Sequence, residues 1–441
     1  MTAPRIVITG AGWVTPLGHD VESTWDSLLR GRSGVGRITR FDAETFRTNF
    51  AAEVRGFDLS AHIDGAPRHS EAGLNAQFAL AAAAQACRQA GIDAARPDPR
   101  RFGVYMASGE GTLDFEHYTS THIAAWDQGA RALDHAEWAR QAQARMSPVA
   151  EIEQEANLTL SHIAWAFDCR GPAVNCLTAC AASIQAIGEA TEMLRRGDAD
   201  VMLAGGSHSM IHPLGITGFI RLTAMSARRD DPAAAARPFD QTRDGFVMGE
   251  GAGVLVLETE DHARARGARP LAEVAGYGSS ADAFRVTDMH PDGKGPRDAM
   301  LAALRQARVW PREPLPDGRP AVQYIAVHGT GTKENDRIET KAVKQVFGPH
   351  APRIPMSSVK SMMGHLIAAA GVSNAITAVK VIQTGLIPPT INYKNPDSEL
   401  DLDYVPNTAR DARPSGGVQA CLCNSYGFGG QNDALLIRAL A

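Results

Sequence analysis

The stretch AVNCLTACAAS, residues 173–183, shows how this chain builds its repeating structural unit. Its first part, Ala173–Leu177, has the short and mainly apolar character of a buried strand. Cys180 follows, and a helix of small residues that ends beside a glycine is predicted over Ala181–Arg196. The stretch therefore predicts a strand, a tight turn and a helix, with Cys180 in the turn.

The same succession of elements occurs in the second half of the chain. There the strand-like run Ile354–Val359 leads towards His365, and another helix of small residues is predicted over Ala369–Thr384. Each half also closes with a glycine-rich turn and an apolar strand. We therefore expect two similar halves, residues 1–265 and 266–441, with the cysteine in the first half and the histidines in the second.

Short apolar runs alternate with alanine-rich helical stretches along the chain. This alternation is typical of α/β proteins with substantially parallel sheets. A further helix is predicted over Ala72–Ala90. The other predicted strands are Arg5–Thr9, Gly103–Met106, Asp200–Ala204, Val254–Leu257 and Tyr324–Val327.

Gly10 and Gly12 follow the first predicted strand and superficially resemble a dinucleotide-binding loop. Thr15 and Pro16 stand where that loop would need its third glycine and a regular helix start. We therefore interpret the glycine pair as a tight turn after the strand.

Composition excludes several classes of protein. The 441 residues, 44% hydrophobic and 21% charged, have the balance of a globular protein with a large core. A net charge of -5 argues against a nucleic-acid-binding protein, which normally carries a basic excess. The first residues do not resemble a signal peptide, and no stretch approaches the roughly 20 apolar residues of a membrane span. We expect a cytoplasmic protein with six reduced cysteines that binds neither nucleic acid nor membrane.

Residues 113–160 interrupt the alternation with a mixture of histidines, tryptophans and charges. The stretch predicts a helical cap or insertion, and its histidine spacings match no metal motif, so we expect solvated surface rather than a metal site. Ile123, Trp126, Leu133 and Trp138 are its main apolar residues. They either line a pocket or anchor a surface helix.

Cys180 is the first candidate for chemistry. A sharp turn between strand and helix needs small neighbours, as in the serine elbow of hydrolases, and small residues surround Cys180. The N–H groups at the start of the following helix would lower the thiol pKa and stabilise the thiolate. The same groups could stabilise the oxyanion of a thioester adduct. We predict a nucleophile; the alternative is an inert core cysteine.

Two histidines lie in matching settings. His328 ends a predicted strand and opens HGTGT, whose Thr330 and Thr332 suit an amide-bearing cofactor arm. His365 lies where a strand gives way to a small-residue helix, although it could be a plain helix cap. Catalytic groups concentrate at the carboxyl ends of parallel strands. The histidines therefore form a constellation with Cys180.

This set of side chains suits one reaction in particular. An acyl group held on the cysteine as a thioester can meet a second, malonyl-type thioester that loses carbon dioxide. Two imidazole N–H donors can stabilise the resulting enolate oxygen without a metal. A hydrolase would instead need a carboxylate–histidine–cysteine relay and access for water.

At these residues the sequence resembles the beta-ketoacyl-carrier-protein synthases of the type I/II kind, closest to synthase II. The resemblance covers nearly the whole chain. The matching motifs are TAC at 178–180, GDADVMLAGG at 197–206, RPFDQTRDGFVMGEGAG at 237–253, HGTGTKEND at 328–336, SSVKSMMGH at 357–365, IPPTINYKNPD at 387–397 and NSYGFGGQN at 424–432.

The resemblance implies a thiolase fold, with two similar halves in five αβαβα layers. It also implies a homodimer, although a heterodimer is an alternative, with the acyl pocket near the dimer interface. Substrates would arrive on the phosphopantetheine of an acidic acyl-carrier protein, and the enzyme itself would bind no cofactor and no metal.

The resemblance further implies roles for particular residues. Cys180 would be acylated, and His328 and His365 would assist decarboxylation and condensation. The N–H groups of Cys180 and Phe428 would form the oxyanion hole, and Phe428 would also gate the pocket. The remaining matches are Lys360 and Glu339 as a supporting charged pair, Phe219 in the acyl tunnel, and Thr287, Thr330 and Thr332 on the phosphopantetheine arm.

The chain also departs from the family pattern. Residues 113–160 are longer than usual, and Tyr426 and Gln431 replace the more usual Phe and Thr of the glycine-rich loop. Leu177 and Ala181-Ala182 are uncommon neighbours of the nucleophile. The remaining candidates for a basic carrier-protein surface are Arg68, Arg145, Arg228 and Arg229.

Four alternatives bear on the interpretation. A thiolase would use a second active-site cysteine, and a synthase III type would use one histidine with an asparagine. A non-catalytic chain-length-factor-like subunit would typically lack the cysteine. A polyketide or polyene ketosynthase of a specialised pathway would keep the same chemistry, and the sequence leaves this last alternative open.

Overall fold

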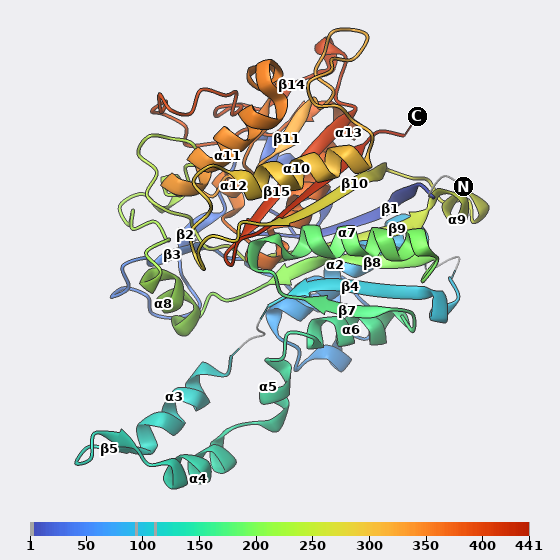
Figure 1. The fold of residues 1–441 in the computed structure, drawn as a ribbon. Helices are drawn as coiled ribbons and strands as arrows, with labels where there is room; N and C mark the ends of the chain where they lie inside the picture. The colour runs from blue at the N-terminus through green and yellow to red at the C-terminus, as the bar shows by residue number, and fades with distance from the viewer. Residues whose placement is uncertain (1–3, 93–95, 110–112, 441) are drawn as a thin grey trace.

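The structure is a computed structural model, which describes residues 4–92, 96–109 and 113–440. Its centre is a mixed sheet of ten strands (Figure 1). In spatial order the strands are β12 (Met356–Ser357), β11 (Tyr324–Ala326), β15 (Ala420–Gly427), β16 (Gln431–Arg438), β10 (Ala272–Ala281), β1 (Ile6–Val14), β9 (Gly251–Thr259), β8 (Val201–His208), β4 (Phe102–Ser108) and β7 (Ala173–Cys176).

The two halves of this sheet have the same strand order. Outwards from the centre, the first half runs β1, β9, β8, β4 and β7, and the second runs β10, β16, β15, β11 and β12. In each half the strands therefore follow the order first, fifth, fourth, second, third. β1 and β10 pair antiparallel where the halves meet, with Ile6 opposite Val274. The domain boundary near residue 265 stays a prediction.

The expectation of a substantially parallel sheet holds only at the two ends. β4 pairs parallel with β7 and β8, and β11 pairs parallel with β12 and β15. All five pairs between β8 and β15 are antiparallel. One cause is visible at β15 and β16, which a short glycine-rich turn joins as a hairpin, whereas a parallel pair needs a longer crossover.

Helices complete a layered arrangement. The principal helices are α1 (Val21–Leu29), α2 (Leu74–Ala90), α6 (Leu158–Phe167), α7 (Ala182–Arg196), α8 (Pro213–Arg221), α9 (Glu260–Ala265), α10 (Lys294–Gln306), α11 (Lys333–Phe347), α12 (Lys360–Met363) and α13 (Ala370–Thr384). α2 packs on β1 and β9, and α10 packs on β10 and β16. α7 and α13 pack on each other and contact strands of both halves. The five layers of a thiolase fold are therefore α2, the first half of the sheet, α7 with α13, the second half of the sheet, and α10.

The predicted helices end where the sequence indicated. α2, α7 and α13 stop at Gly91, Gly197 and Gly385, each with a positive φ that glycine adopts without strain. Ile367–Thr384, which includes α13, is long and apolar enough to cross a membrane by length and composition. It is 78% buried between the two halves, as a core helix would be.

Gly10 and Gly12 lie inside β1, so the interpretation as a tight turn was wrong. Both glycines face the alanine-rich helix α2. A Cβ on Gly12 would lie 1.9 Å from the carbonyl oxygen of Ala82, and one on Gly10 would lie 2.1 Å from that of Ala86. The glycines therefore let the α2 backbone pack directly on the strand.

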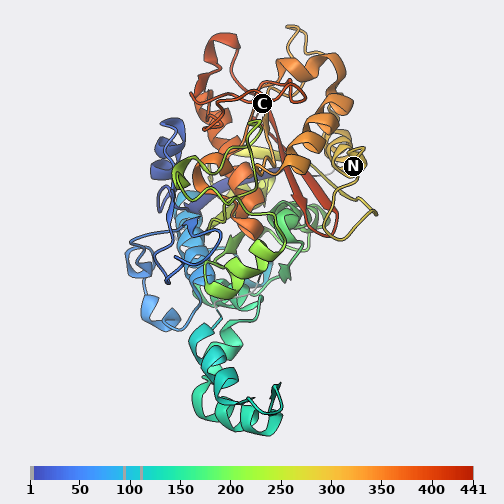
Figure 2. The same cartoon turned by 90° about the vertical axis from the view of Figure 1, so that its left-hand side faces the viewer.

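Within residues 113–160, the elements from α3 to α5 form an arm that projects from the rest of the molecule (Figures 1 and 2). The prediction of a mainly helical insertion is confirmed, with the addition of one short hairpin. The arm consists of α3 (Phe115–Ala124), β5 (Trp126–Asp127), β6 (Ala132–Leu133), α4 (His135–Arg145) and α5 (Pro148–Glu153). Smaller pairs elsewhere are β2 (Val35–Arg37) with β3 (Phe50–Ala52), and β13 (Leu386–Ile387) with β14 (Arg410–Asp411).

Replacing Gly12 by alanine tests the contact between β1 and α2. We expect Gly12→Ala to lower the free energy of unfolding by about 2 kcal/mol or more, because the new methyl group overlaps backbone. Gly218→Ala is the matched control, since nothing in the described structure lies within 4 Å of its Cβ. The control should change stability by less than about 1 kcal/mol. Equal unfolding curves in denaturant for both variants would contradict the packing role.

Candidate active site

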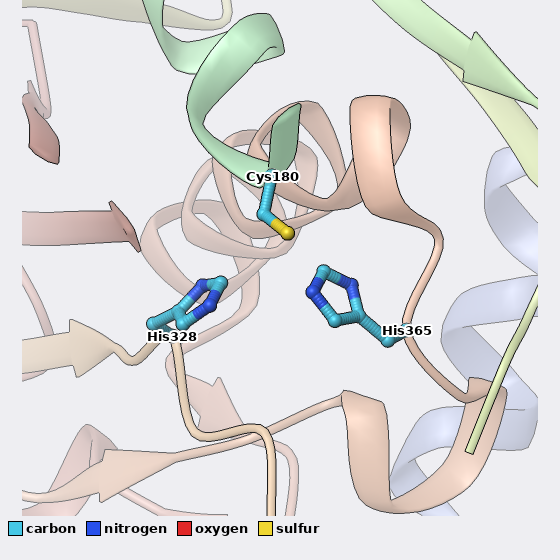
Figure 3. A group of neighbouring side chains, drawn as sticks. All are labelled: Cys180, His328 and His365. Carbon is cyan, nitrogen blue, oxygen red and sulfur yellow. The ribbon is translucent and has the colours of Figure 1, made fainter. Parts of the chain in front are cut away.

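Cys180, His328 and His365 meet at the junction of the two halves (Figure 3). The cysteine sulfur and one nitrogen of each imidazole lie within 4.8 Å of one another. The two rings are 5.4 Å apart between centroids and nearly perpendicular, at 81°. All three side chains are at least 95% buried. The structure therefore brings together the three residues that the sequence singled out.

The turn between β7 and α7 positions Cys180. The turn is a short 3-10 helix over Ala179–Ala181, and Ala179 has a φ of 48°, an unusual conformation for a residue with a side chain. The Ser425 hydroxyl donates to the Cys180 carbonyl at 2.6 Å and ties the turn to β15. The nucleophile thus lies on a locally strained turn that contacts from both halves hold in place.

The expectation of a lowered thiol pKa was wrong. Burial raises the pKa of Cys180 to about 11, although the Lys360 ammonium and hydrogen bonds from the N–H groups of Phe428 and Cys180 act in the opposite direction. The helix start could be predicted from the sequence, whereas the desolvation of the Cys180 thiol could not, because it depends on the packed structure. The resting group at neutral pH is therefore a thiol, and a nearby base must accept its proton when it attacks.

Both imidazoles are neutral at neutral pH. Burial, with a further contribution from Lys360, holds the pKa of His328 and of His365 well below the ordinary value. His365 Nδ1 accepts the Ile367 N–H at 3.1 Å, so its proton must be on Nε2. His365 Nε2 and His328 Nδ1 are buried and have no hydrogen-bond partner among the described residues. Each ring therefore offers at least one free nitrogen.

Glu339 and Lys360 both bond to the backbone around His328, and the Glu339 carboxylate also acts electrostatically on the Lys360 ammonium. Glu339 accepts the N–H groups of His328 and Gly329 at 2.9 and 2.8 Å, and Lys360 donates to the His328 carbonyl at 2.6 Å. Within the described ranges no ion pair joins the two charges. Burial raises the pKa of Glu339 and lowers that of Lys360. The predicted charged pair is a clamp with His328 between its members.

A pocket of about 510 Å³ opens onto these side chains. Phe428 and the three predicted arm-binding threonines line it, whereas Phe219 does not. Phe219 packs behind Phe246, whose ring lies 5.6 Å from Phe219 and 5.4 Å from His365. The lining also includes Leu222, Thr223, Ala224, Asp244, Asp282, Asp288, Met289, Lys333, Glu334, Asn335, Ile367 and Tyr426.

Sequence reasoning missed several residues that shape the site. Phe246 lies in the motif at 237–253 and separates His365 from Phe219. Asn424 donates to Glu339 at 3.1 Å. Asn374, in α13, donates to the Val327 carbonyl at 3.1 Å and fixes the strand end before His328. A buried polar residue on an apolar helix was the available signal for Asn374.

The cysteine and imidazoles are also a donor set that a soft metal ion could use. The free nitrogen of His365 carries the ring proton and can only donate a hydrogen bond, whereas the unbonded ring of His328 can donate a hydrogen bond or accept a proton, according to its tautomer. The sequence prediction of a metal-independent site stays a prediction.

Comparisons with known proteins agree with this geometry. The model described as beta-ketoacyl synthase, N-terminal domain, matches residues 3–263, and the C-terminal domain model matches residues 271–394. The chain is 38% identical to a 3-oxoacyl-(acyl-carrier-protein) synthase 2 of Coxiella burnetii over 437 residues, 99% of each chain. It is 38% identical to one of Staphylococcus aureus over 434 residues, 98% of each chain.

Two solved structures match the whole chain. One is a ketosynthase of a type II polyketide synthase, in complex with its acyl-carrier protein and bound to a hexaketide, with a TM-score of 0.85 and 32% identity. The other is the ishigamide ketosynthase/chain length factor, with a TM-score of 0.86 and 33% identity. Each comparison covers 100% of both chains. With its matched domains, its full-length relatives and its cysteine between two histidines, this chain belongs to the beta-ketoacyl synthase family.

Proposed function

We propose that this chain condenses an acyl group held on Cys180 with malonyl-carrier protein and lengthens a fatty acyl chain by two carbons. One observation carries the proposal: a buried thiol and two neutral imidazoles with free nitrogens face one pocket. The relatives named 3-oxoacyl-(acyl-carrier-protein) synthase 2 support a fatty acyl substrate. The two polyketide-related structures support the alternative of a specialised pathway with the same chemistry.

The first step is acyl transfer. The Cys180 thiol attacks the thioester carbonyl of the acyl-carrier protein while a neutral imidazole takes its proton. The N–H groups of Cys180 and Phe428 already reach the sulfur, which supports their role as donors to the oxyanion beside it. The carbon–sulfur bond to the carrier then breaks, and the carrier thiolate takes the proton from the imidazolium.

The second step is decarboxylation and condensation. The bond from the malonyl α-carbon to its carboxylate breaks, carbon dioxide leaves, and the electron pair forms an enolate. The free nitrogens of His328 and His365 donate to the enolate oxygen. The carbon attacks the acyl thioester, the bond to Cys180 breaks, and the Cys180 thiolate takes up a proton from water, because both imidazoles are neutral at this stage. The product stays on the carrier, two carbons longer.

The carrier protein would approach the mouth of the pocket. The Thr330 and Thr332 hydroxyls lie 2.9 Å apart at its wall, and Thr287, on an exposed loop, also lines it, so the three could meet the phosphopantetheine arm. Of the four predicted arginines, Arg228 and Arg229 come shortly after residues 222–224 in the chain, and residues 222–224 line the pocket. Arg229 forms an ion pair with Glu44 at 3.1 Å, which leaves Arg228 as the arginine at this edge that an acidic carrier could meet.

Replacing Cys180 tests the nucleophile. We expect Cys180→Ser to keep its fold and lose condensation, because a hydroxyl is a far poorer nucleophile than a thiolate. Cys180→Gln, whose amide resembles an acyl thioester, should still decarboxylate malonyl-carrier protein. The control is Cys176→Ser, a neighbouring cysteine whose thiol donates to the Ala182 carbonyl. Mass spectrometry of the acyl adduct gives the readout, and undiminished acylation of Cys180→Ser would refute the assignment.

Replacing the histidines tests the division of labour. We expect His328→Ala and His365→Ala each to slow malonyl decarboxylation about a hundredfold, or about 3 kcal/mol, because one donor to the enolate is lost. Acyl transfer to Cys180 should fall less, since backbone donors serve the first oxyanion. His350→Ala, on an outer 3-10 helix, is the control. Normal carbon dioxide release by both active-site variants would contradict this step.

The arm at residues 113–160 supports the predicted dimer. Two of its four main apolar side chains face solvent, since Ile123 is 71% exposed and Trp126 is 44% exposed, and none of the four lines the pocket. Exposed apolar groups clustered on a projecting element are typical of interfaces between subunits. We propose that the arm contacts a second subunit and affects chain length only through that contact.

Removing these side chains tests the arm. We expect the double variant Ile123→Ala and Trp126→Ala to weaken self-association at least tenfold, because buried apolar area drives it. Trp310→Ala removes a tryptophan outside the arm that is 55% exposed, and it should leave association unchanged. Sedimentation velocity across a concentration series measures both. A dimer of undiminished stability in the double variant would assign the arm to free surface.

A further inference from the structure

Tyr426 carries a polar group that the proposed reaction has not used. Its side chain is only 4% exposed and lines the pocket at the end of β15. Its ring lies 5.5 Å from the His328 ring, between centroids. The hydroxyl is buried and has no hydrogen-bond partner in the part of the chain that the structure describes. Leaving such a group unpaired is costly, so the site is built for a partner that arrives with the substrate.

The phenol can act only as a neutral donor. Burial, with the neighbouring carboxylates of Glu339 and Asp282, raises the pKa of Tyr426 well above its ordinary value. The hydroxyl therefore keeps its proton at any pH at which the protein works. The ligand that satisfies it must supply an acceptor oxygen.

Among the oxygen atoms of the two substrates, only one group remains as a candidate acceptor for the Tyr426 hydroxyl. The acyl thioester oxygen faces the N–H groups of Cys180 and Phe428, and the malonyl thioester oxygen faces the two imidazoles. Thr330 and Thr332 lie on the wall assigned to the carrier arm, and their hydroxyls are bonded to each other. The acyl chain belongs to the apolar cluster around Phe246 and Ile367, which does not include Tyr426 among the described residues. The oxygens still without a partner are those of the malonyl carboxylate.

Because the pocket wall is mainly acidic, the malonyl carboxylate needs a hydrogen-bond donor in order to bind there. Four acidic side chains line the pocket, from Asp244, Asp282, Asp288 and Glu334, against one exposed cation, Lys333. A substrate carboxylate that binds against this acidic wall needs a hydrogen bond from a fixed donor to remain beside His328. Tyr426 lines the pocket beside His328 and carries an unpartnered hydroxyl that can donate such a bond.

We propose that the Tyr426 hydroxyl donates a hydrogen bond to the carboxylate of the malonyl unit and so selects and positions the extender. This inference rests on the proposed function. Because the hydrogen bond is made to the group that leaves, it stabilises the bound substrate more than the transition state. Tyr426 therefore lowers the KM for malonyl-carrier protein without raising kcat.

The test compares Tyr426→Phe with the unchanged enzyme and with Tyr404→Phe. Tyr404 is a buried tyrosine whose hydroxyl contacts Thr340 at 2.9 Å, away from the pocket. We measure Cys180 acylation by acyl-carrier protein, and KM and kcat for malonyl-carrier protein by carbon dioxide release. For Tyr426→Phe we expect KM to rise about tenfold or more, kcat to stay equal or rise, and acylation to stay unchanged. Tyr404→Phe should change none of the three.

Other outcomes separate the possible errors. An unchanged KM in Tyr426→Phe would overturn the inference and leave the proposed function intact. A lower kcat at unchanged KM would also overturn it and assign the hydroxyl to the enolate instead. If the unchanged enzyme releases no carbon dioxide from malonyl-carrier protein, the proposed function fails first, and the inference with it.

Discussion

The close contact between the first turns of α7 and α13 determines where the reactive side chains lie. The Ser183 hydroxyl accepts the Val372 N–H at 2.9 Å, and a Cβ on Gly371 would lie 2.6 Å from the Ile184 side chain. Only small residues allow two helix starts to approach so closely. Because Cys180 directly precedes one helix and His365 precedes the other, this contact brings thiol and imidazole together. Asn374 extends the same contact to the strand end before His328.

Much of this arrangement could be predicted from the sequence, because it depends on local patterns. The turn at Cys180, the helix ends at glycine and the catalytic trio follow from residue types in fixed order. Pairing direction could not be predicted from alternation, because antiparallel strands at the centre of the sheet are as apolar as parallel ones. Gly10 and Gly12 were misread since their partner, the α2 backbone, is some 70 residues away along the chain.

The electrostatic errors have a different cause. A thiol at a helix start invites the prediction of a low pKa, but burial of Cys180 outweighs the helix and Lys360. The two histidines escape protonation for the same reason. Glu339 and Lys360 were expected as a supporting charged pair, and the structure adds that both bond to the backbone of His328. Desolvation depends on the complete packed structure, and no short motif records it. Phe219 lies behind Phe246 in the apolar cluster beside Cys180, so its assignment to the acyl tunnel stays a prediction.

The repeated strand order has a consequence for how such a site could arise. The turn that carries Cys180, between β7 and α7, corresponds by position to the segment between β12 and α13 that carries His365. A fused pair of copies of one ancestral gene would have two equivalent loops facing each other here. Fusion frees each loop to diverge, since the two no longer share one coding sequence. One loop could then specialise in covalent attachment and the other in holding negative charge, a division of labour closed to a symmetric dimer of identical ancestors.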